Sequence, residues 1–145
     1  MNQELVGRVF GPGEPYEVSR VKIAEFADAI GEPSELCRDK AAAQRAGYPD
    51  VIAPPTFARL IASLVTEQVH HDPELGLDYS MIVHLEQSLS HSRPLHAGDV
   101  VVAITTVESI KQVGPMWLVV TSTDIRTTDG EHVCTANSTL AERGQ

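Results

Sequence analysis

The sequence of 145 residues is acidic, with 20 Asp and Glu residues against 11 Lys and Arg residues and a formal net charge of −9. A chain of this length buries about two thirds of the surface that its unfolded form exposes, so it needs neither disulfides nor a structural metal. The charge argues against nucleic acid as a partner, and no apolar run approaches the roughly 20 residues of a membrane helix. We expect one cytoplasmic domain over residues 1–145, without a secretory signal and with Cys37 and Cys134 as free thiols.

The N-terminal part of the chain predicts a short strand and a helix. Residues 5–10 are typical of a strand, which the Gly-Pro-Gly sequence at residues 11–13 would end. Ser19 is a suitable N-cap for a helix whose apolar residues continue to Ile30. Gly31 would stop this helix, since glycine adopts the left-handed conformation of a helix C-terminus without steric cost.

Two more helices are expected before the middle of the chain. Asp39 is a suitable N-cap for a short helix, which Gly47 would end in a left-handed conformation. A longer helix begins after residues 54–56, because proline is tolerated in the first helical turn. Its apolar residues recur with helical periodicity and form a stripe that must face a core: Phe57, Leu60, Ile61, Leu64, Val65 and Val69.

The second half of the chain predicts strands. Alternating or β-branched segments cover residues 81–91, 99–110, 116–127 and 131–141, and turn signals separate them. The short connections predict that strands adjacent in sequence are antiparallel neighbours. A long amphipathic helix followed by four strands predicts an α+β fold, in which an antiparallel sheet wraps around the helix.

Two segments resemble motifs of the hotdog-fold MaoC-like hydratases and dehydratases. Residues 31–57 contain Gly-Glu-Pro-Ser-Glu-Leu-Cys, Gly-Tyr and Ile-Ala-Pro-Pro-Thr-Phe, which resemble the family's Gly-Asp-x-Asn-Pro-x-His followed by Gly-Phe-x-x-x-Ile-Ala-His-Gly. Residues 86–99 resemble the strand and turn that follow the family's central helix. The chain looks most like the actinobacterial branch, which includes the substrate-binding subunit of the mycobacterial (3R)-hydroxyacyl-carrier-protein dehydratase. The resemblance covers nearly the whole chain and implies a single hotdog domain acting on (3R)-hydroxyacyl and trans-2-enoyl thioesters.

The family mechanism uses an Asp and a His five residues later, which activate one water together. The resemblance places Glu32 at the Asp position and Cys37 at the His position, and Ser34 replaces the Asn. A thiol is mostly protonated at neutral pH, so Cys37 is a poor base. The family also polarises the thioester carbonyl with a backbone N–H at the start of the central helix. Pro55 stands there without an N–H, which leaves Thr56 as the nearest donor.

These substitutions imply a subunit that holds the acyl chain while a second, motif-bearing hotdog subunit performs the chemistry. Its candidate catalytic positions, Glu32 and Cys37, are both degenerate. The substrate would be an acyl-CoA or acyl-carrier protein, with no cofactor and no metal ion. The expected substrate contacts lie between the motif loop and the first turns of the central helix: Ser34, Tyr48, Ile52, Pro55, Thr56, Phe57 and Leu60.

Two other functions remain open. A self-sufficient homodimeric hydratase or dehydratase would use Glu32 as its acid and base, together with a second group. A hotdog thioesterase would use Glu32 to activate a water against the thioester carbonyl. A nucleophilic role for Cys37 would need a group that lowers its pKa, and only Arg38 adjoins it in sequence.

The charged residues and the predicted sheet raise three further expectations. Four cations could form a rim for a carrier protein or a coenzyme A phosphate: Arg38, Lys40, Arg45 and Arg93. Scattered solvated charge is the simpler interpretation of these four residues. His84 and Glu86 stand two apart on a predicted strand, so they should share a face, and we favour the solvent face. An exposed edge strand favours pairing with a second hotdog chain, either identical or related.

Overall fold

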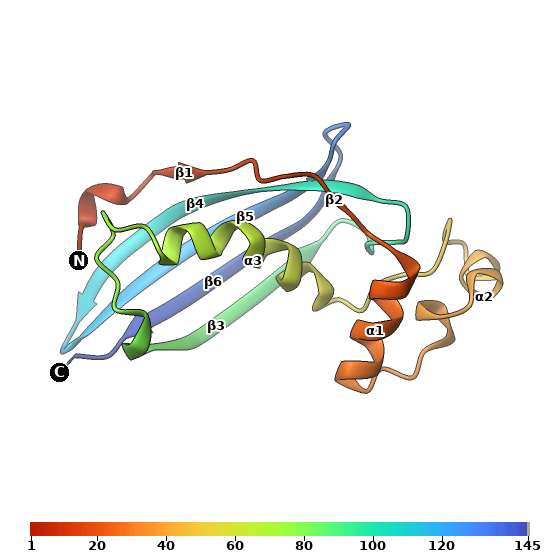
Figure 1. Ribbon diagram of the computed structural model, residues 1–145, viewed down its shortest axis with the longest axis horizontal. Coiled ribbons are helices and arrows are strands. Elements are labelled where there is room, and N and C mark those ends of the chain that lie inside the picture. Colours follow the sequence, from red (N-terminus) through yellow and green to blue (C-terminus); the bar gives the residue numbers. More distant parts are fainter. Residues whose placement is uncertain (145) are drawn as a thin grey trace.

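The computed structural model describes residues 1–144, in which a curved antiparallel sheet packs against one long helix (Figure 1). The helices are α1 (Arg20–Ile30), α2 (Lys40–Arg45) and α3 (Phe57–His70), with short 3-10 segments η1 (Gln3–Leu5), η2 (Glu35–Cys37) and η3 (Tyr79–Met81). The sheet follows the order β1 (Val9–Phe10), β4 (Val100–Val113), β5 (Met116–Thr127), β6 (His132–Glu142) and β3 (Ile82–His91), and β2 (Tyr16–Glu17) also pairs with β4. This is the predicted α+β hotdog fold.

The apolar stripe of α3 forms the centre of the core. Phe57, Ile61 and Val65 are almost completely buried, and burying a side chain of this size stabilises the fold by about 1.5–3 kcal/mol. The ring of Phe57 packs edge-on against Phe26 of α1, with 5.3 Å between the ring centroids. Leu64 departs from the expected stripe, because 50% of its surface stays exposed.

The predicted caps of the first two helices are confirmed. The Ser19 hydroxyl accepts a hydrogen bond from the Lys22 N–H, and Gly31 ends α1 with a φ of 71°. The Asp39 carboxylate accepts hydrogen bonds from the first turn of α2, and Gly47 follows that helix with a φ of 97°. These contacts satisfy backbone groups that a helix end leaves without an intrahelical partner.

The N-terminal strand is shorter than predicted. Only Val9–Phe10 pairs with β4, whereas Gln3–Leu5 forms a 3-10 turn. Strand β2, which pairs with Val100 and Val101 of β4, was not predicted from the sequence. Strands of two residues carry no measurable periodicity, so their existence depends on the neighbouring strand and not on a local pattern.

The prediction that β3 and β4 are neighbours is wrong. β3 pairs with β6, and β4 pairs with β5, so the chain between β3 and β4 crosses the end of the sheet. This crossing segment, residues 92–99, also contacts the strand-like stretch before α3, through the bridge between Ile52 and His96. The length of the connection did not predict which strands pair, because eight residues are enough to pass β5 and β6, the two strands between β3 and β4.

The prediction that His84 and Glu86 share a face is also wrong. The register of β3 against β6 shifts between these two residues, which identifies Leu85 as the extra residue of a β-bulge. The His84 Nε2 atom lies 3.1 Å from the Ser138 hydroxyl on the inner face. Glu86 instead points to the outer face of the sheet.

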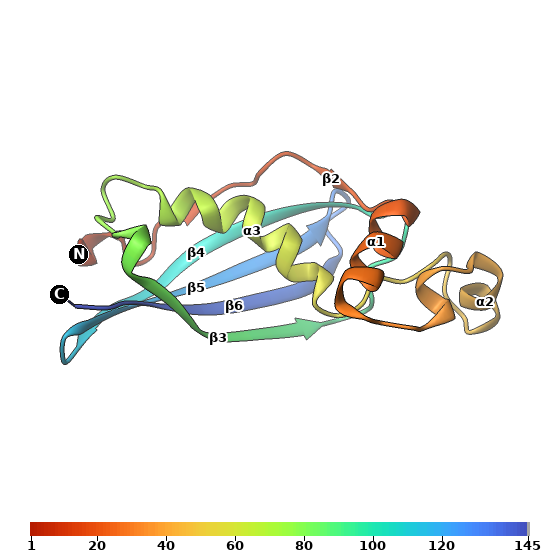
Figure 2. The same cartoon turned by 60° about the horizontal axis from the view of Figure 1, so that its bottom comes forward.

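Figure 2 shows that α1 and α2 lie beyond one end of the sheet, next to the start of α3. This arrangement brings the motif-bearing loop close to the N-terminus of the central helix. The two thiols are free, as predicted, and both are buried. No helix within residues 1–144 is long and apolar enough to cross a bilayer.

Candidate functional site

Three segments meet at the N-terminus of α3. The Ile52 N–H donates to the Leu36 carbonyl at 2.9 Å, which ties the stretch before α3 to η2 of the motif loop. The Ala53 N–H donates to the Leu95 carbonyl at 2.8 Å, which ties the same stretch to the crossing segment. The helix start, the motif loop and the crossing segment therefore form one fixed unit.

The motif loop directs its polar side chains toward its own backbone. The Glu32 Oε1 atom accepts a hydrogen bond from the Ser34 N–H at 3.1 Å. The Ser34 hydroxyl accepts one from the Leu36 N–H at 3.2 Å and so caps η2. Both residues stabilise a turn, a role that short polar side chains commonly have in loops.

Cys37 is a core residue with only 4% of its surface exposed. Burial raises the pKa of its thiol, and the negative charge of Glu32 raises it further. Arg38 acts in the opposite direction, but its guanidinium is also bound to the Asp28 carboxylate at 2.6 Å and to the Ser34 carbonyl at 2.9 Å. At neutral pH Cys37 is therefore a protonated thiol, unsuited to act as base or nucleophile.

The start of α3 presents free backbone donors. The Phe57 N–H is used by a turn to the Pro54 carbonyl at 2.9 Å, and the Thr56 side chain makes no capping bond. The N–H groups of Thr56 and Ala58 have no acceptor within residues 1–144. Unpaired N–H groups and the positive end of the helix dipole together favour an oxygen that carries negative charge.

A pocket of about 370 Å³ opens beside these donors, and we call it the Pro55 pocket. Most of its surface is apolar, as is typical of sites for small organic ligands. It is lined by Ile52, Ala53, Pro55, His91, Ser92, Arg93 and Pro94.

His91 is a titratable residue of this pocket whose side chain is not held by another residue. Its side chain is half-buried and makes no hydrogen bond within residues 1–144, and burial lowers its pKa. The neighbouring Ser92 hydroxyl is bound to the His132 Nδ1 atom at 2.5 Å. The guanidinium of Arg93 is bound to Asp99 and Glu131.

The structure brings together some of the predicted substrate contacts and separates others. Ile52 and Pro55 line the Pro55 pocket, and Thr56 adjoins it in the chain. Phe57 is fully buried, and Leu60 packs against the same core. Several predicted residues do not line this pocket: Glu32, Ser34, Cys37 and Tyr48.

His91 and Ser92 were not predicted as site residues from the sequence. The sequence contained a signal for the direction of His91, because Leu89 and His91 stand two residues apart on a strand and therefore face the same side. Since Leu89 packs against the core, His91 had to point inward as well.

Most cations of the predicted basic rim are paired with acids. Arg38 contacts Asp28, and Lys40 lies 3.8 Å from an Asp50 oxygen. Arg93 contacts two acids in the crossing segment and the β5–β6 turn. Within residues 1–144 only Arg45 of the four has no ion pair, so the rim is largely neutralised by neighbours.

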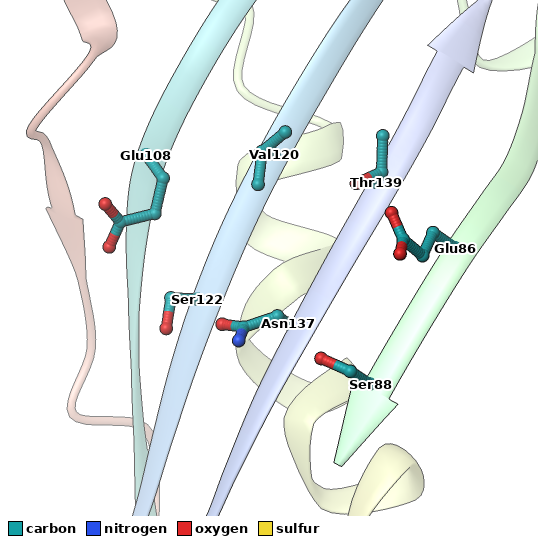
Figure 3. Close-up of a pocket in the computed structure, with 7 residues that line it drawn as sticks. All are labelled: Glu86, Ser88, Glu108, Val120, Ser122, Asn137 and Thr139. Atoms are coloured by element: carbon teal, nitrogen blue, oxygen red, sulfur yellow. The ribbon is translucent and has the colours of Figure 1, made fainter. Parts of the chain in front are cut away.

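A second hollow, of about 390 Å³, lies on the sheet face turned away from α3 (Figure 3). Six of its seven lining residues have polar side chains: Glu86, Ser88, Glu108, Val120, Ser122, Asn137 and Thr139. The strands separate it from the motif loop and from the free N–H groups of α3. The Pro55 pocket is therefore the better candidate for the functional site.

Comparison with known proteins identifies the family of the chain. The family described as "FAS1-like, dehydratase domain region" matches residues 4–136. The chain belongs to this family. Two relatives, each named UPF0336 protein, come from Thermobifida fusca and Streptomyces avermitilis. They are 49% and 45% identical over 144 and 143 residues, and each match covers 99% of this chain and 95% of the relative.

Solved dehydratases share the fold. A chain of the HadBC (3R-hydroxyacyl-ACP dehydratase) complex from Mycobacterium tuberculosis superposes with a TM-score of 0.87 and 26% identity, covering 97% of this chain and 99% of the other. A MaoC-like dehydratase gives a TM-score of 0.85 and 26% identity over 97% of this chain, which spans 42% of that protein. The (R)-hydratase from A. caviae, at 24% identity and a TM-score of 0.70, supports the fold alone. The chain is thus a MaoC-like dehydratase domain.

Proposed function

We propose that this protein is the acyl-thioester-holding subunit of a cytoplasmic (3R)-hydroxyacyl thioester dehydratase, and that a second hotdog chain supplies the acid and base. The substrate is an acyl-CoA or an acyl-carrier protein. The observation that carries the proposal is the combination of a motif loop without an acid–base pair and an open pocket beside free N–H groups.

The motif loop supports the absence of an acid–base pair. Glu32 bonds to the backbone of its own loop, and Cys37 is a buried thiol with a raised pKa. Dehydration needs one group that removes a proton and one that protonates the departing hydroxyl. Neither role fits the surroundings of Cys37.

The start of α3 supports the binding of a thioester. The free N–H group of Thr56, an exposed residue, could receive the carbonyl oxygen of a thioester whose acyl chain enters the Pro55 pocket, whereas Ala58 is fully buried. Such donors stabilise the negative charge that develops on this oxygen when a proton is removed from the neighbouring carbon. We therefore expect the chain to bind substrate without turning it over.

The edge strand β3 is the surface we propose for the partner. Its one neighbour among the strands of residues 1–144 is β6, so its other side has unpaired backbone groups. Leu85, at the bulge of this strand, has 54% of its surface exposed. Exposed edges with apolar side chains favour pairing with another sheet.

Reconstitution tests the proposal. The purified chain is incubated with trans-2-enoyl thioesters, alone and with a hotdog subunit that has the Asp and His motif, while enoyl absorbance and free thiol are followed together. We expect no hydration by the chain alone and at least tenfold more hydration by the mixture than by the partner alone. Glu32→Gln should leave the activity of the mixture unchanged.

The alternative functions give different outcomes in the same assay. Hydration by the chain alone that disappears in Glu32→Gln would establish a self-sufficient enzyme. Thiol release without hydration would establish a thioesterase. For the interface, Leu85→Asp should weaken association with the partner at least tenfold, whereas Val113→Asp, at the equally exposed tip of the β4–β5 hairpin, should not.

A further inference from the structure

The Pro55 pocket contains one polar side chain whose hydrogen bonds are not already used. Ser92 is held by His132, and Arg93 is held by Asp99 and Glu131. The imidazole of His91 has no partner within residues 1–144, although it lies among apolar walls. His91 is only half-buried, and its ring nitrogens are not among the buried unpaired atoms of the structure, so water can reach them. A ligand that enters the pocket displaces such water, and its own polar group can then take over the hydrogen bond to the imidazole.

The strand register fixes the direction of His91. It stands opposite Cys134 of β6, which is fully buried on the inner face of the sheet. Cross-strand partners point to the same face, so His91 points toward the α3 side of the sheet. On that side it shares the pocket wall with Pro55, the residue that immediately precedes Thr56 and its free N–H.

We propose that His91 binds the 3-hydroxyl group of a (3R)-hydroxyacyl thioester in the Pro55 pocket and makes this subunit selective for hydroxylated over saturated acyl chains. The inference rests on the proposed function, which places the thioester carbonyl at the start of α3. It adds a specificity-determining residue outside the motif loop.

The chemistry of the two groups is complementary. A neutral imidazole has one nitrogen that donates and one that accepts, and a hydroxyl group can do both. The hydroxyl of a 3-hydroxyacyl chain is attached two carbons from the thioester carbonyl, so a carbonyl bound at the start of α3 keeps it within this pocket. A saturated chain leaves the imidazole unpaired, and sites built around a ligand hydroxyl discriminate strongly against analogues without it.

Calorimetric titration of the full chain with two pantetheine thioesters of equal length, a (3R)-3-hydroxyacyl and a saturated acyl compound, tests the inference. The wild-type chain should bind the hydroxyacyl compound about tenfold more tightly, the effect of one hydrogen bond of about 1.4 kcal/mol. His91→Phe should abolish the preference by weakening the hydroxyacyl compound alone. His91→Gln, which keeps a donor and an acceptor, should retain most of it.

His84→Phe is the matched control, because His84 lies on the inner face of the same strand but outside the pocket. It should keep the full preference, and thermal melting of each variant verifies the fold. Equal affinity of the wild-type chain for both compounds, or a preference unchanged in His91→Phe, would overturn the role of His91. If the chain then still activates its partner, the proposed function stands, whereas a chain that binds neither compound refutes the proposed function itself.

Discussion

Arg93 and Asp99 form a two-point ion pair across the crossing segment, with 2.9 Å from Nη1 to Oδ2 and 2.9 Å from Nη2 to Oδ1. The same guanidinium also reaches Glu131 in the β5–β6 turn. Asp99 receives a further hydrogen bond from the His96 N–H. This cluster holds the end of the sheet in the geometry that forms one wall of the Pro55 pocket.

Arg93→Ala should lower the free energy of unfolding by about 3 kcal/mol, because it leaves the Asp99 carboxylate, only 5% exposed, without its cation. Urea unfolding at pH 7 measures the change. Lys22→Ala, which removes an exposed pair with Glu25, is the control and should cost less than about 1 kcal/mol. Equal effects of the two substitutions would contradict the structural role of the Arg93 cluster.

Asp50 should make the protein sensitive to acid. The two-point contact with Arg20, together with the hydrogen bond from the Val51 N–H, lowers the pKa of this carboxyl group to about 2. A depressed pKa stabilises the folded state above the unfolded pKa near 4, and the contribution disappears as the pH falls toward 2.

We expect the Asp50 contribution to fall by about 1 kcal/mol between pH 6 and pH 3. Asp50→Asn should remove this part of the pH dependence while lowering stability at pH 6. Urea unfolding of both proteins at the two pH values measures it. An identical loss of stability on acidification in both proteins would show that other carboxyl groups account for the acid sensitivity.

A buried pair of hydroxyl groups links β4 to β5. The Oγ1 atoms of Thr105 and Thr123 lie 2.7 Å apart, and both residues are almost fully buried. Thr105→Val should cost about 1–2 kcal/mol, because the Thr123 hydroxyl loses its partner. The double valine variant should be close to wild type, and a double-mutant cycle by thermal unfolding gives the coupling energy. Additive effects of the two substitutions would exclude a hydrogen bond between them.

The two cysteines should react slowly in the native protein. Burial raises the pKa of both Cys37 and Cys134, which lowers the amount of reactive thiolate. With a thiol-specific disulfide reagent at pH 8, we expect both to react at least about tenfold more slowly in the folded protein than in urea. A rapid phase of one thiol in the folded protein would reopen a nucleophilic role for Cys37.

Features with strong local signals were predictable from the sequence. The stripe of α3, the caps at Ser19 and Asp39, and the long strands all depend on residues close together in the chain. The turn glycines were equally clear, since few other residues adopt a positive φ.

Features set by distant residues were not predictable. The pairing of β3 with β6 depends on more than 40 residues of intervening chain, and the bulge at Leu85 depends on the register against β6. The candidate site shows the same division. The substitutions at Glu32 and Cys37 were visible in the sequence, whereas the inward direction of His91 became certain only with the strand register.

The position of β6 has a consequence for synthesis on the ribosome. This strand is the last in the sequence, yet it lies inside the sheet between β5 and β3. β3 therefore remains without a strand partner until His132–Glu142 has left the exit tunnel. During that interval its exposed backbone is open to pairing with other chains. Slowing translation after β3 should therefore increase aggregation of the nascent chain, an effect that early binding of another protein to this strand would relieve.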